Sequence, residues 1–269
     1  MTVSEQIFSV KDKVILVTGA AGLIGSHFCD VLAQAHATTI LADIDEGKVQ
    51  KNVLAIQEQG YQAMGVQVDI TSPVSINEMV EQVESKYGRL DVLVHCAALD
   101  PKFDRGNMDT HNLNFEDYPL DLWQEAIQVN LTGAFLCAQA TARAMLKSGS
   151  GVMVLLASIY GMVAPDQRIY KDGLFKPPYY SVSKAGILGL TRYIASYYAG
   201  KNIRANALSP GGIYHDHDES FTHEYASRSI MGRMAELSEL DGALLFLASD
   251  ASSYMTGANL VVDGGWTAW

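Results

Sequence analysis

The sequence predicts an α/β fold in which a parallel sheet carries helices on both faces. Short apolar runs alternate with segments of helical periodicity along nearly the whole chain. The first apolar run leads directly into a glycine-rich turn, and the last one ends at Asp263-Gly264-Gly265. Because 48% of the 269 residues are hydrophobic and no shift in composition divides them, we expect residues 1–269 to form one domain with a sizeable core.

The first half of the chain alternates four apolar runs with three helical patterns. We expect strands over residues 13–18, 38–42, 62–68 and 90–96. Helices are expected between them, over residues 23–35, 46–59 and 73–87. Strands that are continuous apolar runs are typical of a parallel sheet that is buried on both faces.

The second half continues the alternation with longer connections. A long helix over residues 122–147 precedes a buried strand over 151–158, which ends in a serine. The pair Pro177-Pro178 suits the entry of another helix, in which apolar positions recur at helical spacing. Strands over 202–208 and 259–262, a partly helical segment over 214–234 and a helix over 236–248 complete the pattern.

The glycine-rich turn predicts a nucleotide-binding site. Gly19, Gly22 and Gly25 let the backbone approach a pyrophosphate, and the N-terminus of the following helix faces its charge. Asp43 ends the next strand, where an acid can accept hydrogen bonds from the adenosine ribose. Its charge favours NAD over NADP, since residues 44–46 offer no cation for a 2′-phosphate. A helix cap is the alternative role for Asp43.

Tyr180 and Lys184 lie one turn apart on one face of the predicted helix. A nearby ammonium stabilises phenolate and lowers the pKa of tyrosine from about 10 towards working pH. The pair could therefore exchange protons with a substrate. Taken alone, a pair with this spacing more often belongs to a solvated helix face.

Three long loops leave the carboxyl ends of predicted strands, where ligands bind in such sheets. They cover residues of about 100–122, 159–178 and 211–235. The alternative is that they are solvated surface loops. Polar side chains in them favour a small polar substrate; those in the first loop are Asp100, Lys102, Asp104, Arg105, Asp109, His111 and Glu116. The third holds His215, Asp216, His217, Asp218 and His223, but without the spacing of a helical metal motif, so we expect no metal site.

Charge and cysteine content exclude several classes of partner. The net charge is −11 and Lys and Arg form no long run, which argues against nucleic acid and anionic membranes. Cys29, Cys96 and Cys137 are widely spaced, as expected of reduced thiols in a cytoplasmic protein. The first ten residues resemble no secretion signal, and no apolar run reaches 18 residues.

Together these features resemble the short-chain dehydrogenase/reductase family. The resemblance rests on Thr18-Gly19 with Gly22 and Gly25, Asp43, Asp69, Asn130, Ser158, Tyr180-x-x-x-Lys184, Pro210-Gly211 and the Asp263-Gly264-Gly265 ending. It implies a Rossmann-type doubly wound sheet and an oxidoreductase that moves hydride between a nicotinamide and an alcohol or carbonyl carbon.

The resemblance also implies roles for individual residues. Tyr180 would be the general acid/base, Lys184 would lower its pKa and bind the nicotinamide ribose, and Ser158 would hold the substrate oxygen. Asn130 would support a water that links Lys184 to solvent. The implied cofactor-binding positions are Gly19, Gly22, Leu23, Ile24, Gly25, Asp43, Asp69, Ile70, Ala97, Tyr180, Lys184, Pro210, Gly211 and Ile213. Asp69 could instead cap a turn.

Several positions depart from the family pattern. The placing of Gly22 and Leu23 resembles a longer, sugar-nucleotide-modifying branch, and His95-Cys96-Ala97-Ala98 stands where Asn-Asn-Ala-Gly is common. Tyr180 follows Ser158 by 22 positions, which implies an insertion relative to compact members. That insertion resembles bacterial members associated with surface-sugar biosynthesis, including nonulosonic acids. His215 stands where a threonine often touches the carboxamide.

These observations predict an NAD(H)-dependent dehydrogenase that acts on a small polar, carbohydrate-like alcohol or carbonyl compound. One alternative is an NADPH-dependent 3-oxoacyl-thioester reductase, and another is a non-catalytic nucleotide-sensing protein. The family resemblance implies a homotetramer or homodimer that pairs through the helices carrying Asn130 and Tyr180.

Overall fold

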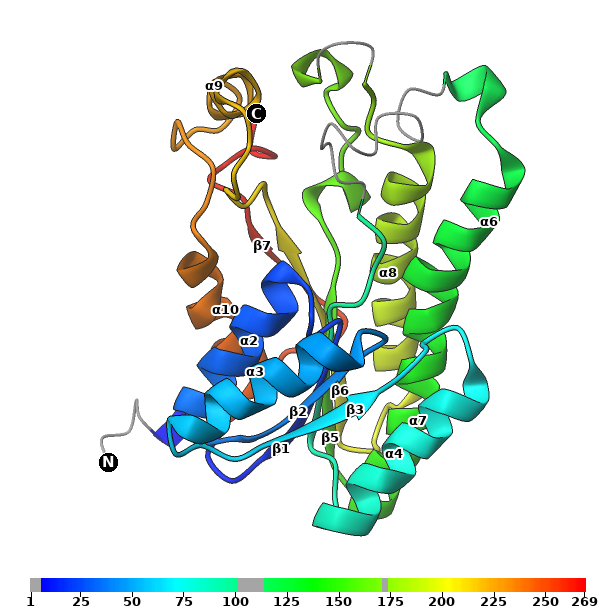
Figure 1. Cartoon of the computed structure of the whole chain (residues 1–269), viewed down its shortest axis with the longest axis vertical. Helices are drawn as coiled ribbons and strands as arrows, with labels where there is room; N and C mark the ends of the chain where they lie inside the picture. Colours follow the sequence, from blue (N-terminus) through cyan, green and yellow to red (C-terminus); the bar gives the residue numbers. More distant parts are fainter. Residues whose placement is uncertain (1–5, 101–113, 171–173) are drawn as a thin grey trace.

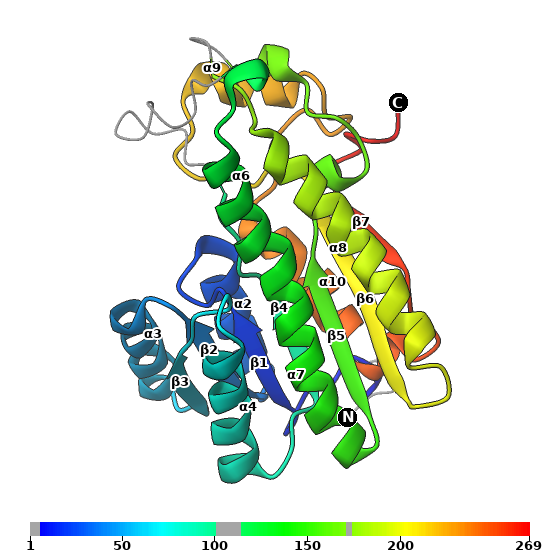
Figure 2. The same ribbon diagram turned by 90° about the vertical axis from the view of Figure 1, so that its right-hand side faces the viewer.

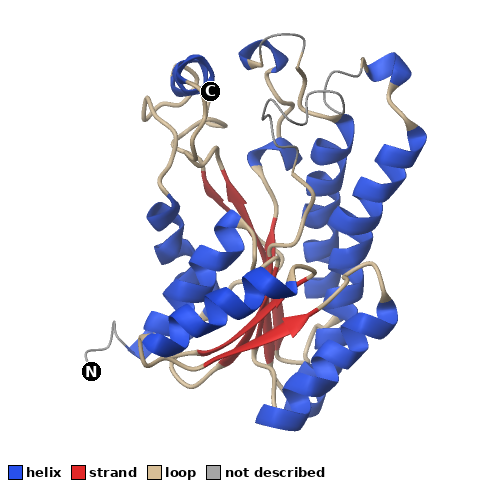
Figure 3. Cartoon of the chain, viewed as in Figure 1, coloured by secondary structure: helices blue, strands red, loops and turns tan. Residues whose placement is uncertain are grey.

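Seven parallel strands form one sheet at the centre of the molecule (Figures 1 and 3). The computed structural model describes residues 6–100, 114–170 and 174–269. The strand order is β3-β2-β1-β4-β5-β6-β7. The strands are β1 (Val14–Thr18), β2 (Thr38–Asp43), β3 (Ala63–Gln67), β4 (Val92–His95), β5 (Gly151–Leu156), β6 (Ile203–Pro210) and β7 (Asn259–Val262).

Helices cover both faces of this sheet. One face packs against α2 (Leu23–Gln34), α3 (Glu46–Glu58) and α10 (Asp241–Ala248). The other packs against α4 (Pro73–Tyr87), α7 (Gly133–Ser148) and α8 (Pro178–Tyr197), which stand in front of the strands in Figure 2. Each face has its own hydrophobic core, so the predicted doubly wound architecture is confirmed.

Local sequence signals set the helix ends. The hydroxyl of Ser72 accepts a hydrogen bond from the Ser75 N–H, and Pro73 occupies the first turn of α4. The same helix ends at Gly88, whose φ of 70° suits a residue without a side chain. The short helix α9 (Glu219–Ala226) begins in the same way, with Asp218 accepting from the Phe221 N–H.

The order of the strands creates a crevice. The chain runs from β1 outwards to β3 and then returns to place β4 on the other side of β1. In such sheets ligands bind outside the carboxyl ends of the strands at this reversal. Figure 1 shows α9 and the C-terminus gathered beyond these strand ends.

The structure corrects the long helix predicted over residues 122–147. It consists of α6 (Leu120–Ile127), a π-helical turn (Gln128–Thr132) and α7. Hydrophobic periodicity does not detect one extra residue in a turn, and such turns are frequent at functional sites. The predicted 236–248 helix is likewise divided into a 3₁₀ turn (Leu237–Leu240) and α10. Further 3₁₀ turns are Phe115–Asp117, Ile159–Gly161, Gln167–Ile169 and Asp250–Ser252.

Within the described residues, no helix combines the length and the apolar character needed to cross a membrane.

Candidate active site

The glycine-rich turn lies at the carboxyl end of β1, against the chain that leaves β4. Gly19 has a φ of 72°, and a Cβ there would lie 2.6 Å from the Ala97 nitrogen. A Cβ at Gly25 would overlap the carbonyl group of Gly19. The backbone therefore passes too closely for side chains at either position. Gly22 precedes α2 and gives it no side-chain cap, so the first N–H groups of α2 suit an anionic pyrophosphate.

Asp43 reaches this turn from the end of β2. Its Oδ2 accepts a hydrogen bond from the Ala21 N–H at 3.0 Å, and its Oδ1 accepts from the Asp45 N–H at 3.1 Å. The cap of α3 is Asp45, which accepts from the Lys48 N–H. The alternative in which Asp43 caps that helix is therefore wrong. Asp43 lies beside the turn, where an acid would face an adenosine ribose.

Asp69 and Ile70 follow β3. Asp69 Oδ1 accepts from both the N–H and the hydroxyl of Thr71, at 2.8 and 2.7 Å. This is the turn-capping arrangement that the sequence left open as the alternative. The Ile70 side chain is buried against Gly133, where a Cβ would come within 2.7 Å of it.

Asn130 lies in the π-helical turn and is 2% exposed. Its Oδ1 accepts from the Leu99 N–H at 2.6 Å, and its Nδ2 donates to the Leu99 carbonyl at 3.0 Å. Nδ2 also lies 3.4 Å from the Ser183 hydroxyl. Asn130 thus fixes the chain leaving β4 to the helix that carries Tyr180. A buried amide with these partners is expensive to replace.

Ser158, Tyr180 and Lys184 lie together beyond β5. The strand β5 ends at Leu156, so the predicted strand over residues 151–158 is too long, and Ser158 lies two positions beyond it. The Ser158 hydroxyl accepts from the Tyr160 N–H at 3.2 Å. The Ser158 side chain is near enough to Tyr180 to lower the pKa of the phenol. On the next turn of α8, Lys184 Nζ is 5.7 Å from the centroid of the Tyr180 ring and donates to the Leu156 carbonyl at 2.9 Å.

Burial dominates the acid–base properties of this group. It raises the pKa of Tyr180 well above the ordinary value, and the charge of Asp100 adds to the rise, whereas the Ser158 side chain opposes it. The expected lowering by Lys184 is not the leading effect. Burial lowers the pKa of Lys184 to about 8. A phenol that keeps its proton suits proton donation to a developing alkoxide.

A second lysine, which the sequence analysis missed, lies over the Tyr180 ring. Lys176 Nζ is 3.9 Å from the ring centroid and 2.7 Å from Asp100 Oδ1. Lys176 precedes Tyr180 by the same four positions that separate Tyr180 from Lys184. This spacing is visible in the sequence. Lys176 lies before the helix that begins at Pro178, however, so helical periodicity does not place it beside Tyr180.

An aromatic cluster that the sequence analysis did not predict packs beside the Tyr180 ring. Tyr160 packs edge-on against both Tyr180 and Trp266, and Trp266 stacks on Tyr225 at 4.3 Å between ring centroids. These rings come from segments far apart in the chain, so no local pattern predicts their contact. The expectation of mainly polar walls is therefore incomplete, since an aromatic cluster stands beside the polar groups.

The residues after β6 close the other side of the crevice. The Gly211 N–H donates to the Val262 carbonyl at 2.9 Å, and Ile213 forms a β-bridge with Ala235. Pro210 is the last residue of β6. A Cβ at Gly211 would come within 2.9 Å of Asp263, so this turn requires glycine. Ile213 is thereby held at the expected edge of the site.

The histidines and acids of this segment do not converge. His217 stacks on Phe221, Asp218 caps α9, and His215 is exposed. Among residues 6–100, 114–170 and 174–269, no group of three or more His, Cys, Asp or Glu side chains could hold a metal ion. The expected polar residues Lys102, Asp104, Arg105, Asp109 and His111 lie outside the described residues.

His95 and Cys96 replace the asparagines of the family pattern. His95 Nδ1 lies 2.8 Å from the Thr18 hydroxyl, which links β4 to β1. Burial lowers the pKa of His95 to about 3, so the ring is neutral at working pH. Among the residues that the structure describes, buried His95 Nε2 finds no hydrogen-bond partner. All three cysteines are free thiols, of which Cys29 and Cys137 are fully buried.

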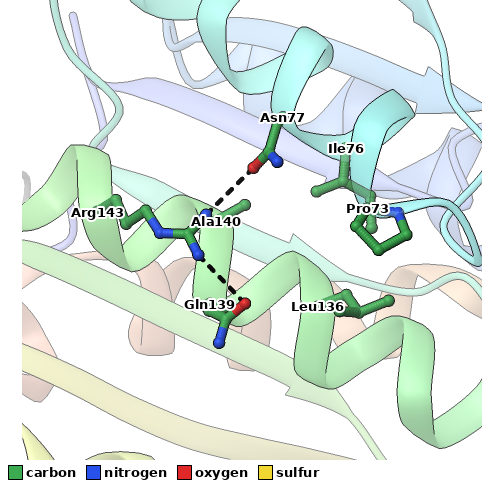
Figure 4. Close-up of a pocket in the computed structure, with 7 residues that line it drawn as sticks. All are labelled: Pro73, Ile76, Asn77, Leu136, Gln139, Ala140 and Arg143. Atoms are coloured by element: carbon green, nitrogen blue, oxygen red, sulfur yellow. Dashed lines mark hydrogen bonds between the residues drawn. The ribbon is translucent and has the colours of Figure 1, made fainter.

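Two hollows lie elsewhere on the surface. The first is between α4 and α7, where Arg143 bridges Asn77 and Gln139, and it contains none of the expected site residues (Figure 4). The second borders α9 and is lined by residues that include Tyr214, His217 and His223. Burial lowers the pKa of His217 in this second hollow, and the charges of Asp100 and Lys176 have smaller effects on it.

Known proteins match this chain along nearly its whole length. A family model described as enoyl-(acyl carrier protein) reductase matches residues 19–267. A cis-4-hydroxycyclohexanecarboxylate dehydrogenase of Sinomonas cyclohexanicum is 34% identical over 266 residues, covering 96% of this chain and 97% of that protein. An NAD-dependent glycerol dehydrogenase of Listeria innocua serovar 6a (strain ATCC BAA-680 / CLIP 11262) is 32% identical over 265 residues, covering 97% and 96%. The crystal structure of gox2181 superposes with a TM-score of 0.89 at 31% identity, covering all of both chains.

Proposed function

The chain belongs to the short-chain dehydrogenase/reductase family of NAD(P)-dependent oxidoreductases, and on that premise we propose that it interconverts a secondary alcohol and its carbonyl compound with NAD(H). The observation that carries this proposal is the contact of Ser158, Tyr180 and Lys184 beyond β5. It stands at the crevice where the glycine-rich turn and Asp43 meet.

Each residue has a role that its contacts support. Ser158 holds the substrate oxygen beside Tyr180, which donates a proton to that oxygen during reduction and, in its ionised form, takes up the alcohol proton during oxidation. The bound nicotinamide supplies the hydride acceptor or donor. Lys184, anchored to Leu156, places a positive charge near Tyr180 and faces the nicotinamide ribose. Asn130 keeps α8 and the chain after β4 in register.

The remaining positions form the proposed cofactor site. Gly19, Gly22, Leu23, Ile24 and Gly25 surround the pyrophosphate, and Ala97 lies against Gly19. Asp69 and Ile70 border the adenine, while Pro210, Gly211 and Ile213 border the carboxamide. We propose NAD rather than NADP, because the Asp43 carboxylate beside the turn would repel a 2′-phosphate.

The proposed substrate is a small alcohol with a polar or cyclic skeleton. Asp100 and Lys176 supply polar groups near Tyr180, and the aromatic cluster supplies flat apolar surfaces. Such a mixture suits a polyol or a ring that carries hydroxyl groups. Relatives named for hydroxycyclohexanecarboxylate and glycerol support this class. The insertion at residues 159–178 forms part of the substrate side.

A panel of substrates tests the proposal. Cyclohexanol, 4-hydroxycyclohexanecarboxylate, glycerol and myo-inositol are each offered with NAD⁺ and with NADP⁺, and the appearance of reduced nicotinamide is followed by its absorbance. A 3-oxoacyl thioester with NADPH tests the acyl alternative suggested by the family model's description. We expect turnover of a cyclic or polyol substrate with NAD⁺. Cofactor binding without any turnover would favour the nucleotide-sensing alternative.

We also propose that the chain forms a homotetramer. Large side chains on the outer faces of α7 and α8 are exposed, namely Phe135, Leu146, Val182, Tyr193 and Tyr197. A second copy of the chain would bury them. A single monomeric species in sedimentation velocity at working concentration would contradict this. The three free thiols support a cytoplasmic location.

A further inference from the structure

Lys176 is a buried cation next to the proposed acid/base. Its side chain is only 9% exposed, and its ammonium lies 3.9 Å from the centroid of the Tyr180 ring. A cation held over an aromatic ring is attracted by the ring and is fixed in direction. The ammonium and the Tyr180 hydroxyl are thus within reach of one small molecule.

The backbone of Lys176 is also fixed. The Lys176 N–H donates to Gln167 Oε1 at 2.9 Å, and Gln167 Nε2 donates to the Lys176 carbonyl at 3.1 Å. This two-way contact closes the loop that follows Ser158 just before α8 begins. A side chain anchored at its backbone and its tip loses little further entropy on binding a ligand.

Asp100 balances the charge of Lys176 from a position that is largely in water. Its Oδ1 lies 2.7 Å from Lys176 Nζ, but the Asp100 side chain is 62% exposed. A buried ammonium needs an anion, whereas an exposed carboxylate loses little when its ion pair opens. Another carboxylate or a phosphate could therefore replace Asp100 without leaving the lysine unpaired.

The other cation near the aromatic cluster is less suited to such an exchange. Arg228 binds two carboxylates at once, with Nε 2.6 Å from Asp166 Oδ2 and Nη1 2.9 Å from Glu224 Oε2. Both acids are less exposed than Asp100. An incoming anion would have to displace both of them. The Arg228 group therefore stabilises the loop, whereas the carboxylate that pairs with Lys176, Asp100, is largely exposed.

The surroundings place Lys176 on the substrate side. His217 lines the hollow beside α9. Burial lowers its pKa, and the charges of Asp100 and Lys176 have smaller effects on that pKa. Asp100 directly follows Leu99, which Asn130 holds against α8. The Lys176–Asp100 pair therefore lies beside Tyr180, next to the chain segment that Asn130 holds.

We propose that Lys176 binds an anionic group of the substrate, a carboxylate or a phosphate carried on the same molecule as the reacting alcohol, and that this group replaces Asp100. The inference rests on the proposed function, because it places the alcohol at Tyr180. Because one anion replaces another, the ammonium of Lys176 stays paired during the exchange. The anion then orients the carbon that reacts.

Binding measurements test this assignment separately from turnover. Cyclohexanecarboxylate and cyclohexanecarboxamide have the same skeleton and no alcohol, and their binding to the enzyme with NADH is measured by calorimetry. We expect the acid to bind about tenfold or more tightly than the amide in the wild type. Lys176→Met should abolish this preference, and Lys176→Arg should restore part of it. Lys147→Met, which removes an exposed ion-paired lysine, is the matched control.

The Asp100→Asn variant distinguishes competition between Asp100 and the substrate anion from a purely structural role of the Lys176–Asp100 ion pair. If Asp100 competes with the substrate anion, the variant should bind the acid several-fold more tightly. If the Lys176–Asp100 pair only holds the loop, the same variant should weaken both ligands and lower the melting temperature. The latter result, or an acid and amide that bind equally to the wild type, would overturn the proposal.

Turnover then identifies the anion. 4-Hydroxycyclohexanecarboxylate is compared with its primary amide, and glycerol 3-phosphate with glycerol. We expect Lys176→Met to raise KM for one charged member of these pairs and to leave its neutral counterpart within about threefold of wild type. Turnover of neutral alcohols without any Lys176-dependent preference would overturn the inference alone. Lys176-dependent binding without turnover of any alcohol would overturn the proposed function alone.

Discussion

Lys184 Nζ donates a hydrogen bond to the carbonyl oxygen of Leu156 at 2.9 Å, inside the protein. The contact ties α8 to the end of β5 and holds the amine near Tyr180. It also keeps the amine out of water, because the Lys184 residue is 4% exposed. Burial lowers its pKa from 10.5 to about 8. A group with a proposed role in the reaction is thus held in an environment that disfavours its charge.

The first prediction concerns stability against pH. The unfolded chain binds the Lys184 proton up to a pH near 10.5, whereas the folded chain releases it near 8. Between these values the unfolded state holds more protons, so the free energy of unfolding rises with pH, by at most about 3 kcal/mol for this group. Lys184→Met should remove that rise and should be at least as stable as wild type at pH 7.

Denaturant unfolding at a series of pH values between 7 and 10 checks this. Lys147→Met is the control, because its ammonium is exposed and paired with Glu84. A Lys184→Met profile that keeps the wild-type slope would show that the buried amine does not carry the effect.

The second prediction concerns cofactor choice. Asp43→Ala removes the negative charge beside the glycine-rich turn, along with the acceptor of the Ala21 N–H. The preference for NAD⁺ over NADP⁺ in kcat/KM should fall by about tenfold or more, because like charges in a site cost several kcal/mol. Asp45→Ala is the control, since Asp45 is the neighbouring carboxylate and caps α3. If both variants change the preference for NAD⁺ equally, the overall negative charge near Asp43, and not the Asp43 carboxylate itself, determines cofactor choice.

The third prediction compares two glycines. A methyl group at Gly25 would overlap the Gly19 carbonyl, whereas one at Gly189 on α8 would meet no described atom within 4 Å apart from the nearby backbone of its own helix. Gly25→Ala should destabilise the fold by about 2–3 kcal/mol and weaken NADH binding. Gly189→Ala should stabilise it by roughly 0.5–1 kcal/mol, because alanine has less entropy to lose in a helix. Thermal unfolding of both variants provides the comparison, and a neutral Gly25→Ala would contradict the close packing of the turn.

The sequence predicted the sheet and its helices because their signals are local. Apolar runs placed all seven strands, and the helix expected over residues 73–87 has the same bounds as α4. The four-residue spacing of Tyr180 and Lys184 also survives in the structure, since one helix carries both. The prediction of a single helix was wrong at the π-helical turn. There Asn130 is buried and makes contacts with Leu99 and Ser183 that a regular α-helix pattern does not predict.

The surroundings of Tyr180 could not be predicted in the same way. Trp266, Tyr225 and Tyr160 meet there from three distant segments, and Asp100 joins Lys176 across 76 positions. Such contacts depend on how loops fold over the sheet. The pKa of Tyr180 followed from this burial, so the sequence overstated the effect of Lys184.

Loss of the Tyr180 hydroxyl tests the central claim most directly. Steady-state turnover of the best alcohol in the panel is measured for Tyr180→Phe, together with NADH affinity by fluorescence. Tyr179→Phe, which changes the adjacent buried tyrosine, is the control. We predict that Tyr180→Phe lowers kcat by about 10²–10⁴-fold and leaves NADH affinity within about threefold, while the control stays active. Turnover by Tyr180→Phe close to that of wild type would contradict the assignment of Tyr180 as the acid/base.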